Sequence, residues 1–268
     1  MATSGDVVRQ IAVISAAVFM IIAAMVGTGL LGGTPVQDLQ GGALDQDGSF
    51  LAPARPAFQI WSVIYLGLLV YTVWQALPGQ RANRRQRHLG WFIAATMVLN
   101  GVWLVTAQFL TLLLTVVAIV LLVAMLGWTF QRAVADPPDG WVDALLIDGV
   151  TGLHLGWVTL ATVANTAALL TEIAPGSWDV YPQQISVAVL VVVALVGVAI
   201  AWASRWRFSP GLAMAWGLTW IAVARLTREP HSDAVGIAAI IVAIVVVVPP
   251  VVMTVVRVTR ESRGVSAG

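Results

Sequence analysis

The chain alternates long apolar stretches with short polar segments, and this pattern predicts membrane-spanning helices. A helix needs about 20 mostly apolar residues to cross the hydrocarbon core of a bilayer. The stretch 89–133 is too long for one crossing, so we expect two helices there, joined by a tight turn near residues 108–111. The other stretches predict one helix each, at 7–31, 57–77, 141–170, 183–204, 210–226 and 233–256. The predicted fold is therefore an all-α polytopic membrane protein with about eight transmembrane helices.

The composition agrees with a membrane protein and excludes several other classes. Hydrophobic residues make up 59% of the 268 residues and charged residues only 10%, which does not fit a soluble globular domain. No basic run is interleaved with aromatic residues, so nucleic-acid binding is not indicated. The chain has no cysteine, which excludes disulfides and thiolate metal sites. The first apolar stretch is long and lacks a small-x-small cleavage site, so we expect a retained helix rather than a secretory signal.

The basic residues, all of them arginine, are unevenly distributed between the predicted loops. With the N-terminus inside, only Arg55, Arg225 and Arg228 fall on the outer side. The inner side collects Arg9, Arg81, Arg84, Arg85, Arg87, Arg132, Arg205, Arg207, Arg257, Arg260 and Arg263. Positive charge favours the cytoplasmic side of a membrane, so we expect both termini in the cytoplasm. We also expect a multi-pass protein of an inner (cytoplasmic) membrane, in contact with the lipid bilayer.

A few polar and aromatic side chains recur at helical spacing within the predicted spans. Side chains three or four residues apart share one face of a helix. Three such faces occur: Trp61 and Tyr65; Asn100 and Trp103; His154, Trp157, Ala161 and Asn165. Because an Asn or His side chain is costly in lipid, we expect these faces to look into the bundle. They would line a pocket for a flat, mostly apolar ligand, or their polar groups would simply bond neighbouring helices.

The spacing of these residues resembles the TspO/MBR family of tryptophan-rich sensory proteins, which includes the mitochondrial translocator protein. The resemblance covers residues 8–172 and rests on Trp61-x-x-x-Tyr65, on Leu99-Asn100-x-x-Trp103 and on Trp157 followed by Asn165. It implies a five-helix bundle whose central pocket binds porphyrins and related tetrapyrroles. The residues that it assigns to the pocket or its support are Trp61, Tyr65, Asn100, Trp103, Trp157 and Asn165.

The C-terminal part has no counterpart in the five-helix members of that family. It is similar to the three-helix extension of longer bacterial relatives. We therefore expect a five-helix unit at residues 1–175 and a three-helix unit at residues 176–268.

The sequence departs from the family pattern next to the motifs. Pro56-Ala57-Phe58 stands where a second Trp is usual, and Leu153-His154-Leu155 stands where Pro-Tyr is frequent. Thr166-Ala167-Ala168-Leu169 stands where another Trp often follows. We therefore do not carry over the cholesterol binding that the resemblance implies for animal members, and tetrapyrrole binding stays an expectation.

Two ionisable residues within the spans each allow two interpretations. His154 would contact a haem iron or donate a proton to a porphyrin carboxylate, or it would be a neutral imidazole bonded to a neighbouring helix. Asp148 would pair with an arginine of the inner loops rather than belong to a proton relay. The three histidines, His88, His154 and His231, are far apart in the sequence, so we expect no shared metal site.

The sequence leaves several functions open. We expect a membrane receptor or sensor for a tetrapyrrole such as a porphyrin or haem, with no obligatory cofactor. The alternatives are a transporter of such ligands, an enzyme that breaks porphyrins down photo-oxidatively, and a non-catalytic accessory subunit of a membrane complex. A homodimer and a partner membrane protein both stay open. The Gly- and Asp-rich loop 32–56 would form a lid over the pocket.

Overall fold

The regular structure of this chain is helical. The computed structural model describes residues 3–173 and 181–265, and within these ranges the predicted all-α class is confirmed. The described part contains eight long helices: α1 (Ser4–Gly27), α2 (Ile60–Ala76), α3 (Arg84–Phe109), α4 (Leu112–Ala135), α6 (Val150–Ile173), α7 (Pro182–Ala203), α8 (Ser209–Thr227) and α9 (Asp233–Val265). A short helix α5 (Trp141–Asp143) runs into α6 through a π-helical turn at Ala144–Gly149.

Most helices begin and end near the predicted positions. The turn between α3 and α4 falls at Leu110 and Thr111, as predicted, and the Thr111 hydroxyl caps α4. α1 ends earlier than predicted, because Gly29 and Gly32 adopt positive φ angles of 83° and 84° that do not continue a helix. α9 extends beyond the predicted end near residue 256, as far as Val265.

Seven of the helical segments are long and apolar enough to cross a membrane, and α8 is not among them. The prediction of about eight spans is thus confirmed in part. α8 is less apolar because it contains Pro210, Gly211 and Gly217 and carries Arg225 in its last turn. All four residues are buried. A helix that other helices shield from lipid can carry such residues at little cost.

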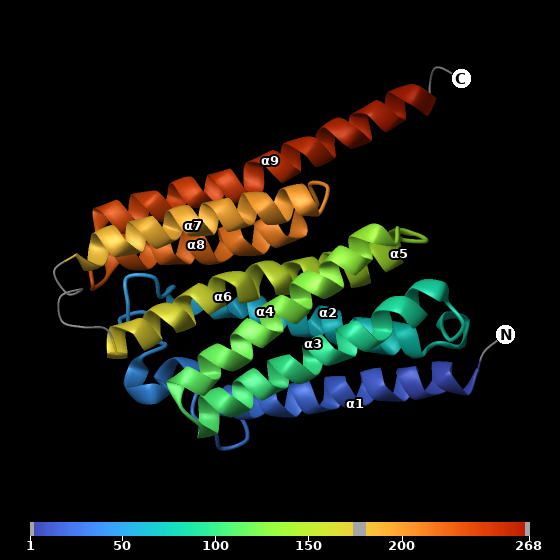
Figure 1. Ribbon diagram of the computed structural model, residues 1–268, viewed down its shortest axis with the longest axis horizontal. Helices are drawn as coiled ribbons and strands as arrows, with labels where there is room; N and C mark the ends of the chain where they lie inside the picture. The colour runs from blue at the N-terminus through green and yellow to red at the C-terminus, as the bar shows by residue number, and fades with distance from the viewer. Residues whose placement is uncertain (1–2, 174–180, 266–268) are drawn as a thin grey trace.

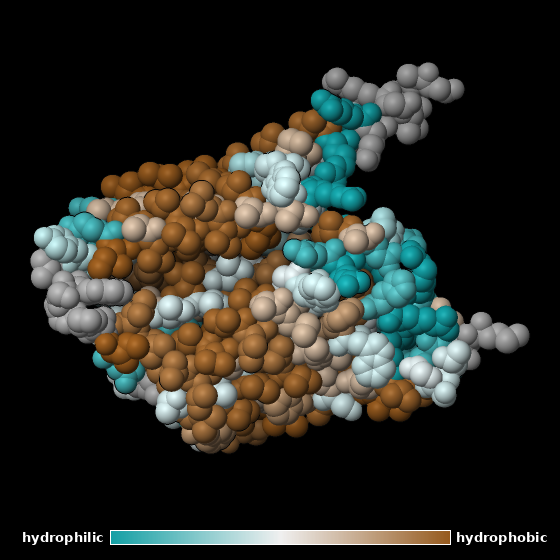
Figure 2. Space-filling view, in the orientation of Figure 1, coloured by the Kyte–Doolittle hydropathy of each residue, from teal (hydrophilic) through white to brown (hydrophobic). Residues whose placement is uncertain are grey.

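α6 lies between two groups of helices (Figure 1). On one side α1, α2, α3 and α4 pack together and against α6, and on the other side α7, α8 and α9 pack together, with α8 against α6. α1 begins and α9 ends at the same end of the molecule, on the right of the figure. Figure 2 shows hydrophobic residues along the sides of the helices and hydrophilic residues gathered mainly at that end. This is the surface of a protein whose sides face lipid.

Ion pairs at that end join the two groups of helices. Arg85 is only 1% exposed, and its guanidinium lies 2.9 Å from the carboxylate of Asp143 and 2.8 Å from that of Asp148. Arg207, from the loop between α7 and α8, pairs with Asp148 as well. The expected pairing of Asp148 with an inner arginine is therefore confirmed.

α6 and α8 approach each other closely through glycine. A Cβ added to Gly156 would collide with the backbone carbonyl of Pro210, and one added to Gly152 would collide with the Ser209 hydroxyl. Within a bilayer, small residues let helix backbones pack closely, because burial of apolar surface from water no longer drives association. The contact between α6 and α8 therefore depends on these glycines.

We predict that Gly156→Ala destabilises the folded protein. The new methyl group meets backbone, so the two helices must move apart, and overpacking of this kind costs about 1–3 kcal/mol. Thermal unfolding in detergent should show a lower midpoint than in the wild type. Gly127→Ala in α4 is the matched control, because a Cβ there meets nothing within 4 Å. Equal midpoints for the two variants would contradict close packing at Gly156.

Candidate functional site

Trp61 stands at the centre of a cluster of ring side chains from α2, α3 and α6. Its indole stacks on Tyr65 and on Trp103, with ring centroids 5.0 and 5.7 Å apart and interplanar angles of 21° and 26°. It meets His154 and Trp157 edge to face, at centroid distances of 5.8 and 6.1 Å. Offset-stacked and edge-to-face pairs are the favoured aromatic geometries. The three faces predicted from helical spacing therefore meet inside the bundle.

The local sequence explains how the three helices present these rings. Trp61 and Tyr65 are one helical turn apart in the first half of α2, which follows a short 3-10 helix, η3 (Arg55–Gln59), that contains Pro56. Trp103 and Trp157 are each 2% exposed, so α3 and α6 direct them fully into the protein.

Two asparagines link the helices that carry the rings. The Tyr65 hydroxyl donates to Oδ1 of Asn100 at 3.0 Å, which connects α2 to α3. Trp103 Nε1 donates to Oδ1 of Asn165 at 3.4 Å, which connects α3 to α6. Asn165 also donates from Nδ2 to the Ala161 carbonyl. The alternative that the asparagines bond neighbouring helices is therefore confirmed, in the same residues that surround the rings.

Several polar atoms in the cluster are buried without a hydrogen-bond partner among the described residues. They are Nδ2 of Asn100, Nε1 of Trp157 and both ring nitrogens of His154. His154 is 0% exposed, and the expected bond from its imidazole to a neighbouring helix is not formed. A buried polar group without a partner costs about 1–3 kcal/mol. Unpaired donors of this kind are uncommon in native proteins and need an explanation.

The cluster separates two spaces of very different size. The space between Trp61, Trp157 and the α1–α2 loop (residues 28–54) measures only about 30 Å³, room for a water molecule or two. A cavity of about 350 Å³ lies toward α1, and Trp61, Tyr65 and Trp103 form part of its wall. Small-molecule pockets usually measure about 300–1,000 Å³. The larger cavity, toward α1, therefore has the size of a ligand site.

Not all the residues predicted to line the pocket face one of these two spaces. His154 and Asn100 line neither of these two spaces, because the rings of Trp61 and Tyr65 lie in front of them. Trp157 and Asn165 line only the small space. The helical spacing placed all these residues on inward faces correctly, but it did not indicate that Trp61 fills the centre.

Sequence reasoning missed part of the site. Phe58 lines both spaces and packs edge to face on Trp157, with ring centroids 5.9 Å apart. The available signal was its position three residues before Trp61, in the segment where the resemblance implies a second Trp. α1 contributes Ile21, Ala24 and Met25 to the larger cavity, and no motif marks these residues.

The α1–α2 loop covers the cluster, as the lid prediction required. Val36 and Leu44 are buried against the rings and line the small space. Arg55 holds the loop through ion pairs of 2.8 Å to Asp38 and 2.7 Å to Asp45. The hydrogen bonds from Arg55 keep the pKa of the Asp45 carboxyl below its usual range, so this side chain stays ionised at neutral pH.

α8 fixes the same loop from the other side. The Arg225 side chain is 0% exposed and donates to the carbonyls of Gln46 and Ser49, at 2.6 and 3.0 Å. Trp216 Nε1 donates to the Ala57 carbonyl in η3, at 2.9 Å. Arg225, which the charge pattern assigns to the outer side, is therefore buried, and loop carbonyls take the place of water beside its guanidinium.

The comparison with protein families shows to which family the chain belongs. The model of the TSPO-like protein family matches residues 10–252. The chain belongs to the TSPO-like family. The match confirms the resemblance drawn from the motifs and extends past residues 8–172 across α7, α8 and most of α9. Searches of the curated proteins and of the solved structures find no match for this TSPO-like protein.

We predict that Arg225→Met loosens the α1–α2 loop of this TSPO-like protein. The variant keeps an apolar side chain but removes hydrogen bonds from a charged donor, which contribute about 1.5–3 kcal/mol each. Amide hydrogen exchange in residues 44–54 should become about tenfold faster or more. Arg228→Met is the matched control, because this arginine is exposed and its side chain makes no hydrogen bond to the described loop residues. Unchanged exchange in Arg225→Met would contradict the role of α8.

Proposed function

We propose that this TSPO-like protein is a membrane receptor or sensor that binds a tetrapyrrole, such as a porphyrin or haem. The ligand would occupy the 350 Å³ cavity between α1 and the aromatic cluster. The observation that carries the proposal is the wall of this cavity, in which Trp61 stacks on both Tyr65 and Trp103. A flat macrocycle binds well against the faces of other rings. Membership of the TSPO-like family supports the same class of ligand.

Trp61 would act as the moving part of the site. It lines both spaces, so a change of its side-chain rotamer joins them into one larger pocket. The same movement would give the ligand access to the N–H of Trp157, which lines the small space and has no hydrogen-bond partner among the described residues. An acceptor group on a ligand, such as a carboxylate, would accept a hydrogen bond from it. The cost of the unpaired donor is then recovered when the ligand binds.

The proposal includes no axial bond from His154 to a haem iron. The imidazole is fully buried against the edge of Trp61 and does not line the cavity toward α1. Stacking and apolar contact therefore hold the macrocycle in this proposal. Metal-free protoporphyrin should then bind about as tightly as haem.

The positions of the buried acids favour a protein that binds its ligand over one that transports it together with ions. Coupled transporters usually place carboxylates along a pathway within the membrane. Asp143 and Asp148, the acids buried at the start of the α5–α6 segment, instead form ion pairs with Arg85. They line neither space at the aromatic cluster.

We also propose that all eight helices cross a bacterial inner membrane, with both termini in the cytoplasm. Arginines of the predicted inner segments lie together: Arg9 donates to the Arg81 carbonyl, and Arg257 donates to the Arg205 carbonyl. Positive residues favour the cytoplasmic face. The α1–α2 loop would then cover the ligand cavity from the outer side.

An absorption titration of the purified protein with protoporphyrin tests the proposed ligand. The wild type should bind saturably, and Trp61→Leu and Trp103→Leu should each weaken binding about tenfold, because each removes a stacking face. Trp91→Leu is the matched control on α3, since this Trp is 47% exposed and lines neither space at the cluster. Equal binding by all four proteins would contradict the site, and no saturable binding by the wild type would contradict the function.

The variant His154→Phe distinguishes a macrocycle held by stacking from a haem held through a bond between His154 and its iron. The variant keeps a ring of similar size against Trp61 but removes both nitrogens. We expect it to bind haem and protoporphyrin with the same ratio of affinities as the wild type, and with the same haem Soret maximum. A Soret shift and a loss of affinity confined to haem would contradict the conclusion that His154 does not bind iron.

A further inference from the structure

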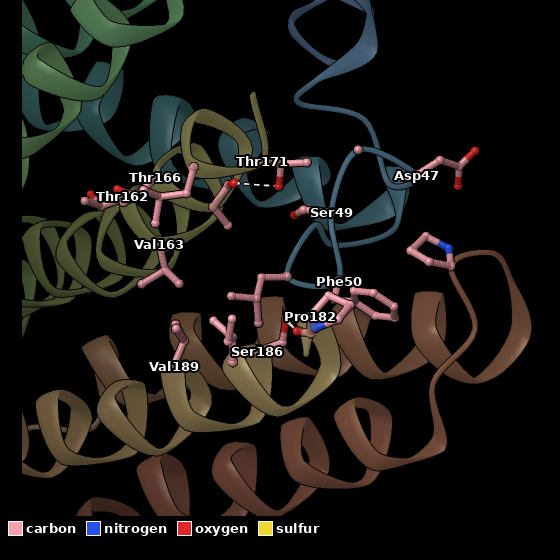
Figure 3. A pocket seen from close by; sticks show the side chains of 16 residues that line it. Asp47, Ser49, Phe50, Thr162, Val163, Thr166, Thr171, Pro182, Ser186 and Val189 are labelled. Carbon is pink, nitrogen blue, oxygen red and sulfur yellow. Dashed lines mark hydrogen bonds between the residues drawn. The ribbon is translucent and has the colours of Figure 1, made fainter. Parts of the chain in front are cut away.

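A groove separates α7 from α6 and α4, on a different face of α6 from the aromatic cluster. Near the α1–α2 loop it is a cavity of about 440 Å³ lined by α6, α7 and loop residues 47–51. Toward the loop between α7 and α8 it continues as a cavity of about 370 Å³ lined by α4, α6 and α7. Thr162 and Val163 line both cavities, so the two form one groove. Figure 3 shows Val163 of α6 and Val189 of α7 pointing into it from opposite sides.

The walls of this groove are aliphatic. On α7 they include four aliphatic residues that recur on one helical face, Ile185, Val189, Val196 and Ile200, and the Ser186 hydroxyl beside them donates to the Pro182 carbonyl. On α6 the hydroxyls of Thr159 and Thr162 donate to backbone carbonyls of their own helix, each at 2.7 Å. These hydroxyls therefore need no ligand partner. The aromatic rings among the lining residues are only Phe50 and Phe130, so the groove offers no stacked wall for a macrocycle.

The length of the groove matches the thickness of a bilayer. On α7 and the start of the α7–α8 loop, the lining residues run from Pro182 to Ser204, which corresponds to roughly 33 Å of helix at 1.5 Å per residue. The hydrocarbon core of a bilayer is about 30 Å thick. Figure 2 shows that this side of the molecule is hollowed between two bands of hydrophobic residues. A long aliphatic chain fits such a groove better than a compact ligand.

The end of the groove near the α1–α2 loop is polar and acidic. The Ser49 hydroxyl lines it and is buried with no hydrogen-bond partner among the described residues. An adjoining hollow of about 450 Å³ shares Asp47 with the groove and is also lined by Asp45 and Glu172. Asp45 is paired with Arg55, whereas Asp47 and Glu172 form no ion pair with a described residue. No arginine lines the groove or the hollow among the described residues.

We propose that this groove binds a membrane lipid with an ammonium head group, of the phosphatidylethanolamine type. An acyl chain lies between α6 and α7, where the aliphatic walls exclude polar groups. The Ser49 hydroxyl donates to the phosphate or ester oxygens, and the ammonium group lies beside Asp47 and Glu172. A lipid with an anionic head group would meet the two carboxylates as like charges, which is unfavourable. The site is separate from the tetrapyrrole site, and neither proposal rests on the other.

Native mass spectrometry of the detergent-purified protein tests this proposal with two lipids that have identical acyl chains. We expect phosphatidylethanolamine to bind at least about tenfold more tightly than phosphatidylglycerol. Val189→Trp fills the groove and should weaken phosphatidylethanolamine binding at least about tenfold. Val191→Trp is the matched control, because Val191 is on the same helix, is 53% exposed and does not line the groove.

Further variants test the acyl-chain part and the head-group part of the site separately. Ile185→Trp, at a position that is 37% exposed, repeats the filling test where a larger ring is easily tolerated. Replacing both carboxylates, with Asp47→Asn and Glu172→Gln, should abolish the preference for phosphatidylethanolamine while the acyl chain still binds. Equal binding of the two lipids by the wild type, or full binding by both filled variants, would overturn the proposal. Protoporphyrin titration of the same variants should be unchanged.

Discussion

The close contact between α6 and α8 is the interaction on which the rest of the structure depends. α6 carries Trp157 and Asn165 of the aromatic cluster, and it meets α8 at glycines that leave no room for a side chain. α8 also holds the loop that covers the cluster and, through Trp216, the turn that leads into α2. It therefore positions two helices of the site and its cover. This agrees with the burial of Pro210, Gly211, Gly217 and Arg225 in α8, the long helix that is not among the candidate membrane spans.

The bilayer explains the pattern of polar contacts. A charged or polar group within a membrane has no water to replace a missing partner, so the protein must supply one. Arg85 finds two carboxylates, and Arg225 finds two loop carbonyls. The N–H of Trp157 is one of several buried polar atoms that have no hydrogen-bond partner among the described residues. Trp157 lines the small space beside Trp61, which the proposed movement of Trp61 would join to the ligand cavity.

The sequence predicted the helices and the inward faces well, because both follow from local periodicity. Apolar stretches of membrane length indicated the helices, and three- or four-residue spacing indicated which side chains share a face. The paired state of Asp148 could also be anticipated, since an acid near the inner arginines needs a partner. The π-helical turn that precedes α6 could not, because no local residue pattern specifies it.

The remaining features depend on contacts between residues that are distant in the sequence. Arg225 bonds the carbonyls of Gln46 and Ser49, and the charge pattern, which assigns Arg225 only to one side of the membrane, does not indicate this contact. The role of α1 in the larger cavity follows from packing, because Ile21 and Met25 are ordinary apolar residues. Spacing likewise could not show that Trp61 closes the centre of the cluster, since that depends on how three helices meet.

A structure of the protein determined with protoporphyrin bound tests the central claim most directly. The account predicts the macrocycle between α1 and the aromatic cluster, against the faces of Trp61 and Trp103 and beneath the α1–α2 loop. It also predicts that Trp61 changes its position relative to Trp157. A macrocycle bound in the groove between α6 and α7, or on the outer surface with the cluster unchanged, would contradict it.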